Sequence, residues 1–214
     1  GHYMYETKPY CISFYQYLDM KAWYQTKLTP SIHYLAGVAL GKIHLYFVGK
    51  DIKDRKSYKE HPDIRLLKEA PEYMQEPLST LLRAIDSIKK KPGTYGLVHG
   101  DYLFSNLLYK DDQVAVIDFD DIEYNYFIYD IAVYMFYLLL GGDPSDINRE
   151  DNQAVFVSFM QGYRSINQKT CLDFEHMNLF FRLRQLKLYA TIYHMPKEKV
   201  ELLIYCLITS MRRL

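Results

Sequence analysis

A short block of strands and turns, residues 95–121, is set into a sequence whose apolar residues mostly recur at helical spacing. In this block Val98 ends one apolar run, and residues 114–117 form another after a turn-like stretch at residues 110–113. Strands this short are stable only when they pair with one another and helices cover them. The pattern therefore predicts an α+β fold, dominated by helix, that holds a small β block among its helices.

Helix signals stand on both sides of this block. Thr29 and Pro30 are typical of a helix start, and apolar residues follow at helical spacing from Ile32 to Ile43. A second helix is expected from about Pro77 to the cationic residues 89–91, after a charged connection over residues 49–62. Residues 3–18 alternate in polarity and predict two strands joined by a short turn. The remaining helices are expected to end at residues 141–142 and to cover residues 151–163, 173–193 and 197–211.

Charge, hydropathy and cysteine content exclude several classes of protein. The 26 basic and 26 acidic residues cancel, whereas a nucleic-acid-binding domain normally carries a basic excess. The longest apolar run, residues 131–140, has about half the length that spans a bilayer. Three scattered cysteines, Cys11, Cys171 and Cys206, do not make a disulfide framework. We expect a cytoplasmic protein that binds neither nucleic acid nor membrane.

The polar residues of the β block indicate a metal-dependent site. Gly100 allows a tight turn that can hold Asp101 at a fixed, exposed position, and Asn106 follows before the next apolar run. Asp118 ends the run at residues 114–117, which we expect to pair beside the first strand. Asp101, Asn106 and Asp118 can then converge on one small volume. Their oxygens suit a hard cation such as Mg²⁺, which keeps phosphates and waters as its other ligands.

Two other interpretations of these residues stay open. The block could be an acidic turn in an unrelated fold. It could also supply the ligands of a metal hydrolase, although a single histidine is thin ligation for a transition metal. The ligands in that case would be His99, Asp101, Asp118 and Asp120.

A family resemblance favours the first interpretation. The motif His99-Gly100-Asp101 with Asn106, and the motif at residues 117–120, resemble those of the aminoglycoside phosphotransferase and choline kinase family, relatives of the protein kinases. Residues 14–19, 40–44 and 129–132 resemble the hinge, a helix segment and a helix start of the same family. The resemblance implies a protein-kinase-like fold. Residues 1–19 would be a remnant of its N-terminal lobe with the hinge, and residues 20–214 its C-terminal catalytic and substrate-binding lobe.

The resemblance also implies a role for individual residues. Asp101 would be the catalytic base that accepts the proton of the substrate hydroxyl, and Asn106 and Asp118 would hold the Mg²⁺ ions that bridge the phosphates of ATP. Asp130 would brace the catalytic turn. His99 would orient that turn, and His44 would pack under it. The adenine would contact four further residues: the side chains of Leu108 and Ile117, and the backbone of Gln16 and Leu18.

The substrate class follows from the acidic residues that come after Asp118. Asp120, Asp121 and Glu123 would form an acidic lip that suits a cationic amino alcohol, amino sugar or homoserine-like amine. The alternative is that these side chains are solvated loop charges.

Two parts that a complete kinase-like enzyme needs, a glycine-rich loop and a paired strand lysine, are missing from this sequence. We therefore expect an ATP- and Mg²⁺-dependent phosphotransferase that is present here as an inactive C-terminal lobe. It would be a fragment of a longer enzyme or a truncated relative. The alternative is a non-catalytic binding or scaffold protein built on that lobe. The unpaired strand edges of residues 3–15 would favour a homodimer.

Overall fold

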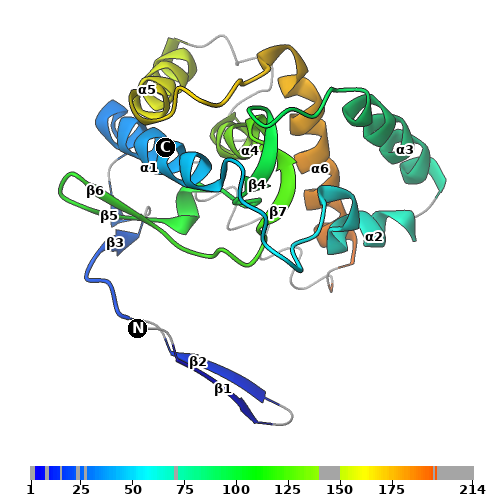
Figure 1. The fold of residues 1–214 in the computed structure, drawn as a ribbon, viewed down its shortest axis with the longest axis horizontal. Helices are drawn as coiled ribbons and strands as arrows, with labels where there is room; N and C mark the ends of the chain where they lie inside the picture. The colour runs from blue at the N-terminus through cyan, green and yellow to red at the C-terminus, as the bar shows by residue number, and fades with distance from the viewer. Residues whose placement is uncertain are drawn as a thin grey trace.

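The computed structural model describes residues 3–7, 10–14, 16–22, 25–26, 28–69, 72–139, 150–194 and 196. Figure 1 shows the helices gathered around small sheets, with one hairpin projecting away from them. The fold is mixed α+β and mostly helical, as predicted. Its elements are β1 (Tyr3–Thr7), β2 (Tyr10–Phe14), β3 (Lys21–Ala22), α1 (Pro30–Phe47), η2 (Tyr58–Glu60), α2 (Pro62–Lys68), α3 (Glu72–Asp86), β4 (Tyr95–Val98), η3 (Phe104–Asn106), β5 (Leu107–Lys110), β6 (Gln113–Val116), β7 (Glu123–Tyr126), α4 (Ile128–Leu139), α5 (Glu150–Ile166), η5 (Phe174–His176) and α6 (Met177–Tyr193).

The strands form three separate antiparallel sheets among the described residues. β1 pairs with β2 in the hairpin predicted for residues 3–18, and β5 lies between β3 and β6. The third sheet is β4 with β7, in the register Val98↔Glu123. The expectation that the strand before Asp118 pairs beside the first strand is therefore wrong, because β6 pairs with β5 and β4 takes β7 instead. The hydrophobic pattern does not predict β7, because two of its buried residues, Glu123 and Asn125, are polar.

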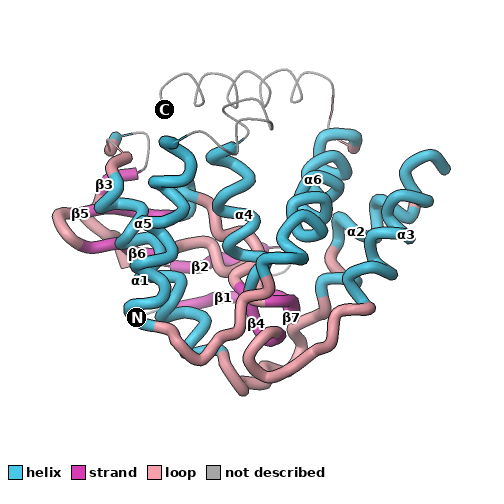
Figure 2. Tube along the Cα trace, turned by 90° about the horizontal axis from the view of Figure 1, so that it is seen from above, coloured by secondary structure: helices cyan, strands magenta, loops and turns pink. Residues whose placement is uncertain are grey.

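Helix α1 begins as predicted and packs closely on α5. Thr29 caps it, accepting a hydrogen bond from the backbone N–H of Ile32, and Pro30 occupies its first turn. Glycines allow the close contact between the two helices. A Cβ atom on Gly37 would lie 1.9 Å from the carbonyl oxygen of Phe159, and one on Gly162 would lie 1.9 Å from that of Tyr34. Figure 2 shows α5, α1, α4 and α6 side by side, with α2 and α3 beyond α6.

Four expectations about element positions need correction or lie outside the described residues. α3 begins at Glu72 and contains Pro77, near which the sequence predicts the start of the helix. The charged connection leads into η2, with Tyr58 fully buried, and then into α2. The helix expected at residues 197–211 and the helix end expected at residues 141–142 lie outside the described residues.

Tyrosines fill much of the core between the helices and the β4–β7 sheet. The buried hydroxyls of Tyr109 and Tyr129 have no hydrogen-bond partner among the described residues. The hydroxyls of Tyr102 and Tyr126, by contrast, donate to backbone oxygens, that of Tyr102 to Ala36 at 2.8 Å and that of Tyr126 to Ile88 at 2.6 Å. This arrangement lets a large apolar ring occupy the core without leaving its hydroxyl unpaired. Among the described helices, none is both long and apolar enough to cross a membrane.

Candidate functional site

The turn after β4 places Asp101 beside the segment that follows β6. Gly100 has a φ of 85°, which favours glycine, and a Cβ atom there would lie 2.1 Å from the carbonyl oxygen of Asp121. The backbone of residue 121 therefore packs directly against the turn. This close approach brings the 118–121 segment next to Asp101.

Asp130, in the first turn of α4, holds this turn in place. Its carboxylate accepts hydrogen bonds from the backbone N–H groups of His99 at 2.7 Å and Gly100 at 2.9 Å. It also pairs with the Nε2 atom of His44 at 2.9 Å, and both side chains are fully buried. Burial raises the pKa of Asp130, but the hydrogen bond and charge of His44, with those of His99, outweigh burial and bring the pKa below its usual value. The brace therefore remains ionised.

His99 connects the turn to the end of β6. Its ring is buried, and its Nε2 atom lies 3.2 Å from the carbonyl oxygen of Ile117. Its Nδ1 atom accepts from the backbone N–H of Asp101 at 3.4 Å. Since both ring nitrogens have protein partners, His99 does not serve as a metal ligand here. The metal-hydrolase interpretation, which needs His99 as a ligand, is therefore not supported.

Asn106 and Asp101 contact one another directly. The Nδ2 atom of Asn106 donates to the backbone oxygen of Asp101 at 2.9 Å and to its Oδ2 atom at 3.2 Å. Because both partners are acceptors, the amide nitrogen must face Asp101, and the amide oxygen is left to coordinate a cation. The backbone N–H of Ile117 donates to the backbone oxygen of Asn106 at 3.0 Å, so the residue before Asp118 is fixed against Asn106.

Asp118 stands in an unusual backbone conformation with an exposed side chain. Its φ of 64° lies in the left-handed region, which Asp tolerates better than most residues. No hydrogen bond or ion pair engages its carboxylate within the described part of the chain. Among the described residues, no group of three or more His, Cys, Asp or Glu side chains could hold a metal by itself. Asn106 and Asp118 fit a Mg²⁺ ion that takes its remaining ligands from phosphates and water.

Arg184, which lies on α6, is a site residue that no pattern in the sequence indicates. Its Nη2 atom donates to the Oδ1 atom of Asp101 at 2.6 Å and to the hydroxyl of Tyr137 at 2.7 Å. Only 12% of its side chain is exposed. No local signal in the sequence connects α6 to the turn, because the two are 83 residues apart.

The three acidic residues expected to form a lip have different environments. Asp120 is exposed, and its backbone oxygen accepts from Arg55 at 3.0 Å. Asp121 lies 3.5 Å from the Nε2 atom of His61, and this contact lowers the pKa of Asp121 more than burial raises it. Glu123 is buried, with both oxygens bound to the ammonium of Lys187 at 3.0 and 3.1 Å. Glu123 is thus neutralised inside the protein, and only Asp120 and Asp121 remain at the surface.

The residues expected to contact adenine lie along the β3–β5–β6 sheet and the segment before it. Leu108 of β5 is half-buried, and Ile117, just after β6, is exposed. Gln16 and Leu18 are exposed, and the backbone oxygen of Leu18 accepts from Met20 at 2.9 Å. The hinge-like segment, residues 14–19, leads into β3, which pairs with β5 through Ala22↔Leu108. An ion pair between Asp19 and Lys110, at 2.7 Å, also connects this segment to β5.

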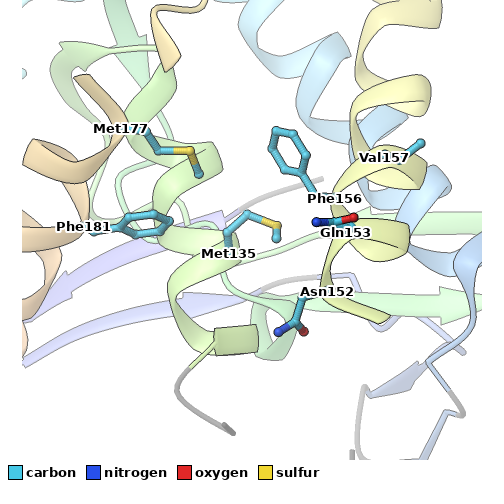
Figure 3. Close-up of a pocket in the computed structure, with 7 residues that line it drawn as sticks. All are labelled: Met135, Asn152, Gln153, Phe156, Val157, Met177 and Phe181. Carbon is cyan, nitrogen blue, oxygen red and sulfur yellow. The ribbon is translucent and has the colours of Figure 1, made fainter. Parts of the chain in front are cut away.

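A separate apolar cavity of about 300 Å³ lies between α4, α5 and α6 (Figure 3). Phe181, one of its lining residues, precedes Arg184 by one turn on the same face of α6. The cavity therefore lies along the helix face that reaches Asp101. Its lining consists of Met135, Asn152, Gln153, Phe156, Val157, Met177 and Phe181.

The sequence matches a known protein family. A family model described as the phosphotransferase enzyme family (APH) matches residues 6–166. The amicoumacin kinase of Bacillus subtilis (strain 168) is 26% identical over 188 residues, which cover 84% of this chain and 54% of that protein. The chain thus spans about half the length of this curated relative.

Solved structures share the fold. An amicoumacin kinase in complex with AMP-PNP, Ca²⁺ and Ami has a TM-score of 0.76 at 18% identity, covering 98% of this chain and 68% of that chain. A microcompartment-associated aminopropanol kinase has a TM-score of 0.63 at 16% identity, covering 99% and 69%. Nearly the whole chain therefore has the kinase-like fold of these proteins.

Proposed function

Because the chain belongs to the phosphotransferase enzyme family, we propose that it is the catalytic lobe of an ATP- and Mg²⁺-dependent kinase that phosphorylates a hydroxyl of a small molecule. In this proposal residues 20–214 form the catalytic and substrate-binding lobe. Residues 1–19 form the remnant of the N-terminal lobe with the hinge. The curated relative is about twice as long as the matched region, so the activity of the whole protein is part of the proposal.

The observation that carries the proposal is the way Asp101 is held. Its turn is braced by the ionised Asp130, its backbone N–H is taken by His99, and its carboxylate contacts Asn106 and Arg184. Two hydrogen bonds, from Asn106 and Arg184, orient the carboxylate itself. Three more hold the backbone of its turn. Such preorganisation is what a positioned catalytic base requires.

In the proposed reaction the acceptor hydroxyl forms a new P–O bond to the terminal phosphorus of ATP, and the bond to the ADP oxygen breaks. The hydroxyl proton goes to the carboxylate of Asp101. Arg184 and Asn106 keep that carboxylate oriented while the hydroxyl approaches it. Little further covalent chemistry is needed, since phosphoryl transfer depends mainly on positioning and charge stabilisation.

Asn106 and Asp118 would hold the metal. When bound, Mg²⁺ supplies positive charge to the phosphate oxygens of the nucleotide. The unpaired carboxylate of Asp118 and the free amide oxygen of Asn106 support this assignment. Leu108 and Ile117, with the backbone of Gln16 and Leu18, would contact the adenine. The related amicoumacin kinase was solved with AMP-PNP and Ca²⁺, which is consistent with a nucleotide and a divalent cation.

For the acceptor we propose an amine-bearing alcohol, in the range from amino alcohols to amino sugars and homoserine-like compounds. Asp120 and Asp121 are the acidic residues that would face its amine, because Glu123 is already paired with Lys187. The name of the aminopropanol kinase agrees with an acceptor of this general kind.

The test is transfer of labelled terminal phosphate from ATP by the complete gene product that carries this chain. The variant Asp101→Asn should lower kcat by about 10²–10⁴-fold, as expected for the loss of a positioned base, with ATP affinity unchanged. Asp112→Asn, in the exposed turn between β5 and β6, is the matched control and should retain full activity. Equal activity of wild type and Asp101→Asn would place the chemistry elsewhere.

A further inference from the structure

We propose that Arg184 and Tyr137 form an acceptor subsite beside Asp101 that binds a carboxylate, so that the substrate is an amine-bearing alcohol which also carries a carboxylate group. This inference rests on the proposed function and narrows its substrate class from amines in general to hydroxy amino acids and their analogues.

The guanidinium of Arg184 is fixed before any acceptor binds. Its Nη2 atom contacts Asp101 at 2.6 Å and the Tyr137 hydroxyl at 2.7 Å, and its Nε atom contacts the same hydroxyl at 3.2 Å. Its central carbon also lies 5.1 Å from the centre of the Tyr137 ring. α4 and α6 thus present one oriented guanidinium at the catalytic turn.

This guanidinium is a permanent charge in a mostly buried place. Burial lowers the pKa of Arg184, but the nearby Tyr129, Tyr137 and Asp101 raise it further, so the net pKa is above its usual value. Within the described part of the chain, its only ion-pair partner is Asp101, the residue that must also receive the acceptor hydroxyl. A buried cation is costly without a paired anion. Because Asp101 must also bind the acceptor hydroxyl, a second anion close to Arg184 is favourable.

The position of the acceptor hydroxyl determines which other group of the acceptor lies next to the guanidinium of Arg184. Asp101 uses its Oδ2 atom for Asn106 and its Oδ1 atom for Arg184, so a hydroxyl bound to Asp101 brings its neighbouring groups to the guanidinium. The Nε and Nη2 atoms of Arg184 are engaged by Tyr137 and Asp101, whereas its Nη1 atom has no hydrogen-bond partner in the described part of the chain. The Nη1 atom can donate charge-assisted hydrogen bonds to a carboxylate. An ammonium in the same place would face a like charge with little water to screen it.

Acidic side chains lie close to the same turn. The backbone of Asp121 packs on Gly100, and the side chains of Asp121 and Asp63 lie 3.5 and 3.6 Å from His61. The charge of Arg184 contributes to the lowered pKa of Asp121, after the stronger effect of His61, so these groups share one electrostatic environment. A zwitterion can place its carboxylate at Arg184 and its ammonium toward Asp121 and Asp63.

Matched pairs of acceptors test the subsite. L-Homoserine and propanolamine differ by one carboxylate, and so do L-threonine and isopropanolamine. Calorimetry on the complete gene product with Mg²⁺ and AMP-PNP should show that the carboxylate-bearing member of at least one pair binds about tenfold tighter or more, as expected of a charge-assisted contact. The inference is overturned if the amines bind as tightly, or if neither member of either pair binds.

Variants then attribute the preference to the guanidinium. In Arg184→Gln the preference should fall to about twofold or less, whereas Arg184→Lys, which keeps the charge but not the fork, should retain part of it. Tyr137→Phe removes only the supporting hydroxyl and should reduce the preference without removing a charge. A preference that survives unchanged in both Arg184→Gln and Tyr137→Phe places the carboxylate elsewhere and overturns the inference.

The same acceptors separate this inference from the proposed function. If the carboxylate-bearing members bind through Arg184 but receive no phosphate from ATP, the proposed kinase activity fails while the subsite stands. If phosphate is transferred to the amines as readily as to the hydroxy amino acids, the kinase activity stands and the subsite is wrong.

Discussion

The carboxylate of Asp130 is shared by donors from two segments far apart in the sequence. His99 and Gly100 supply backbone N–H groups from the catalytic turn, and His44 supplies its ring from α1. Such charge-assisted bonds are stronger than neutral ones, and a buried carboxylate without them would be costly. Asp130 therefore couples the position of the candidate base to the packing of α1 and α4.

Another buried histidine, His33, gives the fold a defined response to acid. His33 is 3% exposed, and its Nδ1 atom lies 2.8 Å from the Tyr134 hydroxyl. Burial lowers the pKa of His33 from 6.5 to about 4. Between these values the unfolded chain binds the proton and the folded chain does not, so stability is complete above pH 6.5 and falls as the pH approaches 4.

We predict that His33 accounts for a loss of about 3 kcal/mol in the free energy of unfolding between neutral pH and pH 4. Denaturant unfolding measured across that range checks the prediction. His33→Gln should flatten the dependence, since no proton is taken up at that position. Tyr134→Phe should cost stability at every pH and keep the slope. An identical slope in wild type and His33→Gln would contradict the prediction.

At the scale of elements, the crossing of α1 and α5 depends on glycines that bring two backbones into contact. Gly37 faces the carbonyl of Phe159, and Gly162 faces that of Tyr34. Neither carbonyl belongs to a flexible side chain, so the helices must separate if a methyl group is added. Because α1 carries His44 and α5 carries Tyr163, which contacts that histidine at 2.9 Å, the same crossing supports the Asp130 brace.

The substitution Gly37→Ala should therefore destabilise the protein by about 3 kcal/mol, at the upper end of typical overpacking costs. Lys42→Ala, on the exposed face of the same helix, should change stability by less than about 0.5 kcal/mol. Thermal and denaturant unfolding of the two variants give the comparison. Equal stabilities would mean that the α1–α5 contact can relax without cost.

Elements with clear local signals could be predicted from the sequence, and those without them could not. The start of α1 was predicted because Thr29 and Pro30 act locally. The start of α3 was misplaced because Pro77, typical of a first turn, here lies inside the helix. β7 could not be predicted because two of its buried residues, Glu123 and Asn125, are polar. The partner of Glu123 is Lys187, which lies on α6, far away in the sequence.

At the scale of the whole molecule, some residues of the candidate site could be predicted from the sequence and others could not. Asp101, Asn106 and Asp118 lie within 18 residues of one another and are connected by short strands and tight turns, so the sequence alone could predict a common site. Arg184 reaches Asp101 only through the packing of α6 against α4, which no local pattern encodes. The proposed acceptor subsite at Arg184 therefore depends on tertiary packing and could not be predicted from the sequence.

The β1–β2 hairpin leads to a prediction about assembly. Among the described residues its strands pair only with each other, and the hairpin projects from the helical body (Figure 1). Since unpaired edges recruit other strands, we predict that the 214-residue chain self-associates through this hairpin. Light scattering should give a mass above that of a monomer, rising with concentration. A version without residues 1–14 should be monomeric, and monomers in both cases would contradict the prediction.

The central claim, that Asp118 holds the metal of a nucleotide site, is tested most directly by calorimetry of ATP binding to the complete gene product with and without Mg²⁺. We predict that wild type binds ATP more tightly with Mg²⁺ and that Asp118→Asn loses this gain by about tenfold or more. Asp111→Asn, another exposed aspartate with positive φ but located in the β5–β6 turn, should retain it. Binding that is independent of Mg²⁺, or equally Mg²⁺-dependent in Asp118→Asn, would contradict the claim.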